Sequence, residues 1–267
     1  MLEAHSLTYS ISEKVIINDV SLQVTPGELL VIVGSNGAGK STLLGLLTGE
    51  IIADKGQLTM NGSSMESIDL KQRAKLRAVL PQQSSLSFPF KVSDVVLMGR
   101  SPHKGMGYEE DQRVVNDVLD AVGVLHLKQR NYLTLSGGER QRIQLARVLV
   151  QIWEKESGEL GKQSRYLLLD EPTSALDLAH QHNTLSIARK FAHEENIGVV
   201  AVLHDLNLAA LYADKIAMMK DGKILEIGSA NSVLNAALIQ QTFNIEVEVV
   251  PHPAHQSCPL VIAYAHQ

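Results

Sequence analysis

The chain has 267 residues, enough to bury a substantial core, and its 45% apolar and 20% charged residues are ordinary for a soluble globular protein. The net charge of -5 argues mildly against a sequence-independent DNA-binding protein, and the single cysteine, Cys258, excludes a disulfide within the chain and fits a reducing cytosol. The N-terminus lacks the pattern of a secretion signal, and no apolar run reaches the about 18 residues of a bilayer-spanning helix, so a membrane role requires a partner.

The N-terminal segments predict an antiparallel sheet. Residues 2–10 and 14–28 alternate apolar and polar side chains, as strands with one exposed face do. Residues 56–62 have a pattern that could extend this sheet. Tyr9 lies in the first segment, where its ring could stack on a nucleotide base, although a lone tyrosine normally packs in the core.

A phosphate-binding loop follows the apolar run of residues 28–34. The sequence GSNGAGKS, residues 34–41, matches the pattern G-x-x-x-x-G-K-[ST], follows a predicted strand and opens a helix expected over residues 40–47. We expect Lys40 to reach the β- and γ-phosphates and Ser41 to hold Mg²⁺. The alternative is a glycine-rich turn, which the flanking strand and helix disfavour. The predicted cofactor-binding residues of this loop are Gly34, Ser35, Asn36, Gly37, Ala38, Gly39, Lys40, Ser41 and Thr42.

From about residue 70 to residue 130 the strand pattern nearly vanishes, and helices with polar loops replace it. We interpret this stretch as a helical sub-lobe inserted into the core. Gln82, in the sequence VLPQQ, is a polar residue at a strand end that could contact Mg²⁺ or the attacking water. Considered alone, it would be an ordinary polar residue.

A second candidate anion site lies in LSGGERQR, residues 135–142, which opens an amphipathic helix predicted over residues 138–153. An ordinary N-cap with an acidic first turn accounts for Ser136 and Glu139. It does not account for Gly137 and Gly138, because two glycines near a helix start are costly unless something must approach closely.

Two further apolar runs, residues 165–172 and 197–205, predict strands buried on both faces. Asp170 ends the first, where it could hold Mg²⁺, and the adjacent Glu171 could activate the attacking water as a general base. Alone, such a pair is usually a solvated turn. His204 ends the second run and could bond a γ-phosphate oxygen, whereas its alternative role is to cap a helix or fill a core position.

Strands that alternate with helices, here over residues 179–195 and 205–212, predict an α/β fold. We expect one domain: a P-loop core with a mainly parallel sheet and an N-terminal antiparallel β subdomain (residues 1–69 and 165–243), an inserted helical subdomain (residues 70–150), and a C-terminal β hairpin (residues 244–267). The polar residues 151–165 are expected to form a surface loop.

The combined motifs resemble the ATP-binding subunits of ABC transporters. The P-loop, LSGGERQR, LLLDEP, SALD at residues 174–177 and the histidine at a strand end occur in the order of that family. The resemblance implies an ATPase that needs ATP and Mg²⁺ and pairs head-to-tail as a homodimer, so that the LSGGE segment of one subunit completes the ATP site of the other. It also implies roles for single residues: adenine stacking for Tyr9, a switch role for His204, a link to the membrane partner for Gln82, and a place at the dimer contact for Asp177. Gln83 stands next to Gln82, and the family's Pro-Gln order favours Gln82.

Residues 88–103 look like the importer subfamily for iron-siderophores, haem and cobalamin, and LDLAHQH and PHPAHQ look most like haem importer ATPases. This resemblance implies two integral-membrane permease subunits, an indirect link to a periplasmic substrate-binding protein, and a peripheral place on the cytoplasmic face of the bacterial inner membrane. No nucleic-acid partner is expected. The importers for siderophores or cobalamin are the alternatives, and ABC ATPases of DNA repair or translation are less favoured because no coiled coil or second ATPase unit is present.

Several histidines invite a direct role in binding haem. His180 and His182 are two apart on a predicted helix and therefore point to different faces, and His252 and His255 lie in a tail rich in turns. We interpret them as surface polar residues, because in this family the cargo passes through the membrane subunits.

Overall fold

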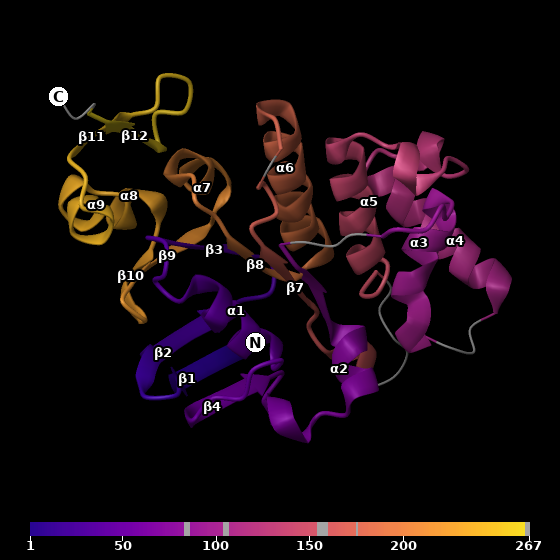
Figure 1. The fold of residues 1–267 in the computed structure, drawn as a ribbon, viewed down its shortest axis with the longest axis horizontal. Helices are drawn as coiled ribbons and strands as arrows, with labels where there is room; N and C mark the ends of the chain where they lie inside the picture. Colours follow the sequence, from indigo (N-terminus) through magenta and orange to yellow (C-terminus); the bar gives the residue numbers. More distant parts are fainter. Residues whose placement is uncertain (83–85, 104–106, 154–159, 175, 265–267) are drawn as a thin grey trace.

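The computed structural model of the chain describes residues 1–82, 86–103, 107–153, 160–174 and 176–264. Figure 1 shows the N-terminal strands below the central sheet, the helices α3, α4 and α5 at the right, and the C-terminal elements at the upper left. None of the helices in these residues is both long and apolar enough to cross a bilayer.

The N-terminal strands form the antiparallel sheet that their alternating pattern predicts. The sheet has the order β2-β1-β4-β5, made of β1 (Leu2–Ile11), β2 (Lys14–Val24), β4 (Lys55–Met60) and β5 (Ser63–Ser64). At its centre, Leu2 pairs with both Val24 and Met60, and all three side chains are buried. The buried face of this sheet covers one side of the core.

A six-stranded sheet with the order β10-β9-β3-β8-β7-β6 forms the centre of the molecule. Five strands run parallel, and the edge strand β10 is antiparallel to β9. The strands are β3 (Leu29–Gly34), β6 (Arg77–Leu80), β7 (Tyr166–Asp170), β8 (Gly198–Val202), β9 (Lys215–Lys220) and β10 (Lys223–Gly228). The whole of β3 and β8 is buried, as their apolar runs predict, so the α/β fold with a mainly parallel sheet is confirmed.

Alternate residues of the central strands enter two separate hydrophobic clusters. Leu30 and Ile32 of β3 pack with the antiparallel sheet and with α1 (Lys40–Thr48). Leu29 and Val31 belong to the other cluster, with α6 (Leu178–Glu195), α7 (Leu206–Tyr212) and the helical lobe. Covered faces on both sides explain why these strands have no polar alternation.

Because the strands are parallel, their carboxyl ends meet at one edge of the sheet. The loop of residues 34–40 leaves β3 there, Asp170 ends β7, and His204 follows β8 by two residues. Gln82 follows β6 in the same way. The fold therefore gathers four motifs that are far apart in the sequence.

The strand β6 lies inside the stretch that we interpreted as helical. Its four residues pair in parallel with β7, so this short segment belongs to the central sheet rather than to the lobe. Four residues give too little periodicity for a sequence pattern to separate a strand from part of a helix.

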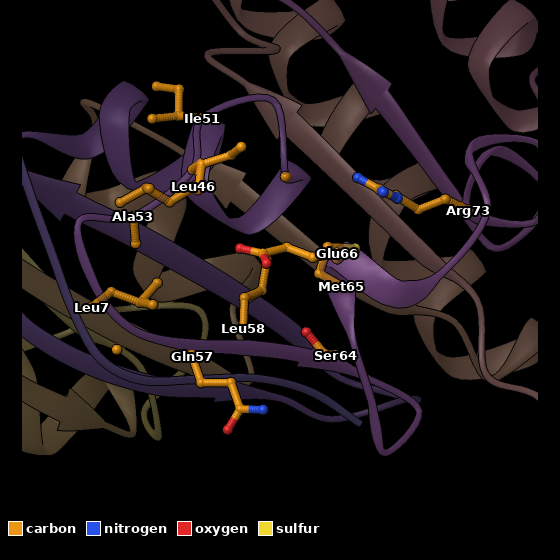
Figure 2. Close-up of a pocket in the computed structure, with 13 residues that line it drawn as sticks. Leu7, Leu46, Ile51, Ala53, Gln57, Leu58, Ser64, Met65, Glu66 and Arg73 are labelled. Carbon is orange, nitrogen blue, oxygen red and sulfur yellow. The ribbon is translucent and has the colours of Figure 1, made fainter.

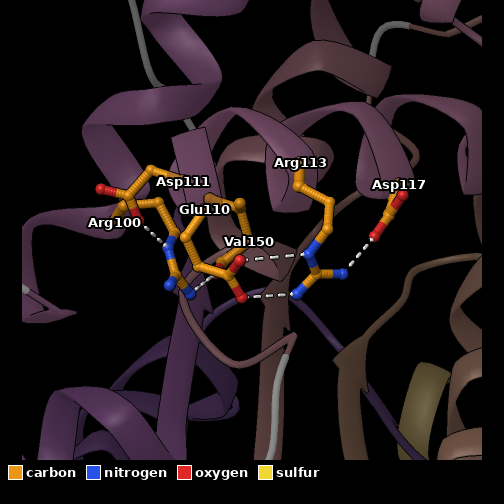
Figure 3. Close-up of polar contacts among 6 residues, drawn as sticks. All are labelled: Arg100, Glu110, Asp111, Arg113, Asp117 and Val150. Atoms are coloured by element: carbon orange, nitrogen blue, oxygen red, sulfur yellow. Dashed lines mark hydrogen bonds and ion pairs between the residues drawn. The ribbon is translucent and has the colours of Figure 1, made fainter. Parts of the chain in front are cut away.

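The helical lobe packs on one side of that sheet (Figure 1). Its elements, together with the short helices that precede it, are η1 (Met65–Ser67), α2 (Leu70–Leu76), α3 (Val92–Leu97), η2 (Met98–His103), α4 (Tyr108–Ala121), η3 (Leu125–Leu127), η4 (Tyr132–Thr134), α5 (Gly137–Leu149) and η5 (Leu160–Lys162). A buried arginine joins three of them. Arg100 of η2 lies 2.8 Å from the Asp111 carboxylate of α4 and donates to the Val150 carbonyl after α5 (Figure 3).

The helix α5 ends at Leu149, four residues before the predicted end at Trp153. Side chains from elsewhere in the fold bind the carbonyl groups that follow it. Arg165 donates to the carbonyls of Ile152 and Trp153, and a His103 ring nitrogen lies 2.7 Å from the Gln151 carbonyl. These bonds give the carbonyl groups after α5 hydrogen-bond partners, so the helix ends here without another turn. Residues 154–159 of the predicted surface loop lie outside the described residues.

The C-terminal part contains α8 (Ala230–Val233), α9 (Ala236–Phe243) and a pair of antiparallel strands, β11 (Val247–Pro251) and β12 (Pro259–Ala263). The side chain of Asn207 fastens this pair to α7. Its amide donates to the Val261 carbonyl over 3.1 Å, and its oxygen accepts from the Val261 amide over 2.8 Å.

Candidate active site

The loop between β3 and α1 approaches other backbone closely, and glycine makes this possible. Gly39 caps α1 with a φ of 98°, in the left-handed region that favours glycine. A Cβ on Gly34 would collide with the Met219 carbonyl of β9. The first amide groups of a helix have no partner within the helix, so this helix start has the geometry that the motif predicts for binding an anion.

The ammonium group of Lys40 is buried inside the loop and binds its backbone. The residue is 6% exposed, and its Nζ donates to the carbonyls of Gly34 at 2.8 Å and Ser35 at 3.0 Å. Burial lowers the pKa of Lys40, while the nearby charges of Glu171 and Asp170 act in the opposite direction. A cation held by neutral carbonyls can turn to a phosphate that offers it a full negative charge.

The hydroxyl of Ser41 and the carboxylate of Asp170 face each other across the sheet edge, 3.5 Å apart. Burial raises the pKa of Asp170, and the neighbouring Glu171 raises it further, whereas Ser41, His204 and Lys40 lower it. Two hard oxygen donors beside an anion site suit Mg²⁺, which usually takes few protein ligands and completes its shell with phosphate and water.

Glu171 is held by two residues that are distant in the sequence. Its Oε2 accepts from the Gln82 side-chain amide over 2.6 Å, and its Oε1 lies 2.6 Å from Nε2 of His204. Its backbone has a φ of 47°, in the left-handed region that a residue other than glycine rarely adopts. The side chain is 14% exposed and that of His204 is 47% exposed. The fold thus brings together Gln82, Asp170, Glu171 and His204, as the motifs predict.

Tyr9 lies on β1 and pairs with Ile17 of β2. The Cδ1 atom of Ile17 would lie 2.9 Å from a Cβ on Gly39, at the start of α1. The tyrosine is partly buried and packs against the cluster below α1. The other predicted residues of the loop precede α1 or lie in its first turn. They are Ser35, Asn36, Gly37 and Ala38 before the helix, and Thr42 within it.

The second candidate anion site is a helix start on a different part of the molecule. Ser136 and Glu139 form a reciprocal capping box: the serine hydroxyl accepts from the Glu139 amide, and the Glu139 carboxylate accepts from the Ser136 amide. This second bond lowers the pKa of Glu139. In Figure 1, α5 lies at the right of α6 whereas α1 lies near the centre. Within the described chain, no hydrogen bond joins residues 135–139 to residues 34–42.

Comparison with known families agrees with this geometry. The sequence profile of the family described as "ABC transporter" matches residues 17–174, which is more than half of the chain. The chain belongs to the ABC transporter family. The matched residues include the P-loop, the start of α5 and the acidic pair Asp170 and Glu171.

Similar proteins of this family cover nearly the full chain. A protein of Gloeobacter violaceus named "Hemin import ATP-binding protein HmuV" is 50% identical over 263 residues, which is 98% of this chain and 94% of that protein. A solved ABC transporter of metal-chelate type, in an inward-facing conformation, is 27% identical with a TM-score of 0.82, covering 99% of this chain and 97% of the other. The cassette MJ0796, solved as a dimer with ADP and phosphate, shares the fold at 24% identity and a TM-score of 0.71, covering 86% of this chain and 99% of the other.

The sequence did not predict that His180 contacts the second helix start. We interpreted His180 as a surface residue, but its ring lies between Asp177 and Gly138. The spacing Asp-x-x-His at a helix start was the available signal, because the third residue of a helix faces its N-cap. His182 points elsewhere and contacts the Tyr212 hydroxyl, as the prediction of different faces requires.

A cavity of about 600 Å³ lies away from the ABC motifs, between the antiparallel sheet and the far end of α1. Figure 2 shows Leu7 at its left and Arg73 at its right. The nine-residue helix α1 separates this cavity from Lys40 by about 12 Å, at 1.5 Å per residue. It is therefore not the site that the motifs predict.

Proposed function

We propose that this chain is the ATP-hydrolysing subunit of an ABC importer that takes up haem through two partner permease subunits. The single observation that carries the proposal is the convergence of Lys40, Asp170, Glu171 and His204 at one sheet edge, in a chain half identical to a hemin import ATP-binding protein. ATP and Mg²⁺ are the cofactors that this site suits.

The residues for ATP follow from the geometry of the loop. The amides of residues 34–42 and the Lys40 ammonium would hold the phosphates, and the Tyr9 ring would stack on adenine. Ser41, Asp170 and Gln82 would hold Mg²⁺, which neutralises charge on the phosphate oxygens. The donors are all hard oxygens, as that ion prefers.

Glu171 is the candidate general base, and its present contacts suggest how it is kept at rest. Both carboxylate oxygens are occupied, one by Gln82 and one by His204. Each contact stabilises the ionised carboxylate and makes it a weaker base, so the transfer of a proton from water becomes more favourable once at least one contact is released. We propose that His204 turns toward the γ-phosphate and Gln82 toward Mg²⁺ when nucleotide is present, so that Glu171 becomes a stronger base only in the loaded site.

The second helix start would complete the site of a partner copy. Apart from its chain neighbours and the nearby backbone of α5, no heavy atom of the described chain lies within 4 Å of the position that a Cβ on Gly137 would take. The capping box uses the amides of Ser136 and Glu139, so the amides of Gly137 and Gly138 are the ones left for an anion from outside the subunit. A head-to-tail homodimer with two shared ATP sites uses both helix starts of every chain.

An exposed aromatic pair supports docking to a permease. Phe88 is 68% exposed and Phe90 is 36% exposed, with ring centroids 6.1 Å apart. They follow Gln82 in the chain, in the segment that leads from the site into the helical lobe. Exposed aromatic rings are enriched at protein interfaces, where they anchor binding. We propose that these rings contact a permease subunit, which holds the chain on the cytoplasmic face of the bacterial inner membrane, with a periplasmic substrate-binding protein linked indirectly.

The test is co-purification followed by transport. Tagged Glu171→Gln protein with Mg·ATP is recovered from native membranes, and the polytopic protein that accompanies it is reconstituted with the wild-type chain in proteoliposomes. We expect ATP-dependent uptake of haem, and no uptake with Lys40→Ala protein. Uptake of a ferric siderophore or cobalamin alone would move the cargo assignment to those importers. Recovery with ribosomes or nucleic acid only would contradict the transport role.

A further inference from the structure

The first turn of α6 holds a histidine in a fixed orientation. Asp177 caps this helix, and its Oδ1 accepts from the His180 backbone amide over 2.9 Å. The same oxygen lies 2.6 Å from Nδ1 of the His180 ring. A carboxylate only accepts, so Nδ1 must donate, and this bond fixes the plane of the ring. These contacts lower the pKa of Asp177.

The opposite edge of the ring lies against the start of α5. A Cβ built on Gly138 would collide with Nε2, Cδ2 and Cγ of His180. Gly138 is helical, and its φ lies outside the left-handed region, so its backbone does not require glycine. Within the described chain, the imidazole is therefore what a side chain at position 138 would meet first. Gly137 next to it faces open space.

Two further hydrogen bonds link the residues that follow Glu171 to α5 and to α6. Gln141, one turn further along α5, donates to the Pro172 carbonyl over 3.1 Å. Gln181, the neighbour of His180, donates to the Leu176 carbonyl over 3.1 Å. Pro172 is thus linked to α5 and Leu176 to α6, and His180 lies between the two helices.

We propose that His180 is a positioning residue. It joins the phosphate-binding start of α5 to Asp177, the N-cap of α6, in the same subunit. This inference rests on the proposed function, in which both surfaces contact the partner subunit. The ring makes them one rigid unit. When a partner's ATP binds at Ser136 and Gly137, Asp177 is then held in register with the partner, and the bond from Gln141 to Pro172 links the same helix start to the residue that follows Glu171.

The first test compares two histidines of one helix. His180→Ala removes the link, whereas the control His182→Ala removes a contact with Tyr212 on another face. Because misplacement of about 1 Å can cost up to 100-fold in rate, we expect His180→Ala to lower kcat by roughly 10- to 100-fold. ATP affinity of the monomer should stay unchanged, because the P-loop is untouched. His180→Gln, which keeps a donor for Asp177, should recover part of the loss.

The second test uses the collision itself. Gly138→Ala should reduce kcat in the wild-type background, and the double variant Gly138→Ala, His180→Ala should be no worse than His180→Ala alone, because the ring that meets the new methyl group is gone. Additive losses would show that Gly138 acts without His180 and would overturn the inference. Equal kcat for His180→Ala and His182→Ala would overturn it as well.

Measurements on the wild-type protein distinguish a failure of this inference from a failure of the proposed function. If the wild-type chain neither hydrolyses ATP nor forms an ATP-dependent dimer, the proposed function fails and this inference fails with it. If the wild-type chain does both and His180→Ala behaves as His182→Ala does, only the positioning role is wrong.

Discussion

Glu171 combines an unfavourable backbone conformation with a doubly occupied carboxylate. A φ of 47° in a residue other than glycine is found where the surrounding structure holds it, often at functional sites. The Ser174 amide and hydroxyl both donate to the Glu171 carbonyl and support this turn. The turn aims the side chain at Gln82 and His204 rather than at solvent.

We expect Glu171→Gln to lower the steady-state rate of ATP hydrolysis by roughly 10²- to 10⁴-fold, the usual contribution of a general base. The amide has nearly the same shape, so nucleotide binding and the turn at residue 171 should persist. Phosphate release and binding of a fluorescent ATP analogue measure the two properties. A variant that hydrolyses ATP at the wild-type rate would remove Glu171 from the role of base.

Lys40 is expected to act on binding instead. Lys40→Ala removes a charge-assisted contact to phosphate worth about 1.5–3 kcal/mol, so ATP affinity should fall by roughly 10- to 100-fold. Lys40→Arg is the matched control for charge, because it keeps the cation but changes its shape. Titration calorimetry with ATP measures the change. Unaltered affinity in Lys40→Ala would contradict the phosphate contact.

Among the elements, the helical lobe depends on one buried ion pair. The Arg100 side chain is 2% exposed, and its partner Asp111 lies in the first turn of α4, 22% exposed. In contrast, the pair between Arg113 and Asp117 on the same helix is about half exposed on both sides (Figure 3). Burial decides how much each pair contributes, because solvent screens the exposed one.

We therefore expect Asp111→Asn to lower the free energy of unfolding by about 2 kcal/mol, since it removes the negative charge that faces the buried guanidinium of Arg100. Asp117→Asn, the same change in the same helix, should cost at most about 0.5 kcal/mol. Urea denaturation followed by circular dichroism measures both. Equal effects of the two substitutions would show that the buried pair does not hold the lobe.

At the scale of the whole molecule, the proposed dimer would use both helix starts. No hydrogen bond in the described chain joins residues 135–139 to the P-loop, so in that dimer ATP held by one subunit would reach the other start across an interface. ATP bound between two subunits stabilises the dimer by mass action, and its hydrolysis weakens it.

This arrangement predicts an ATP-dependent dimer. Glu171→Gln protein with Mg·ATP should double its mass in sedimentation or light scattering, because ATP is bound but not consumed. Lys40→Ala protein should stay monomeric under the same conditions. A monomer of Glu171→Gln at saturating ATP, with nucleotide demonstrably bound, would contradict the shared site.

Local sequence patterns predicted the elements around the site well. The strand β3, the glycine loop and the start of α1 form one uninterrupted segment, and so do the strand β7 and the acidic pair at its end. Buried parallel strands need continuous apolar runs, and a helix start needs a cap, so these features are visible in a few neighbouring residues. The roles given to the site residues remain predictions until the variants are measured.

Contacts between distant segments were outside the reach of these patterns. The membership of β6 in the sheet, the early end of α5 and the contact of His180 with Gly138 each depend on partners from elsewhere in the chain. The motifs predicted that Gln82 and Glu171, 89 residues apart, lie at one site, but not the direct bond between their side chains. The amino-acid sequence by itself determined the chemical groups and the local elements that carry them. Only the tertiary structure decided which groups meet, because that depends on packing between elements whose separation along the chain no local period records.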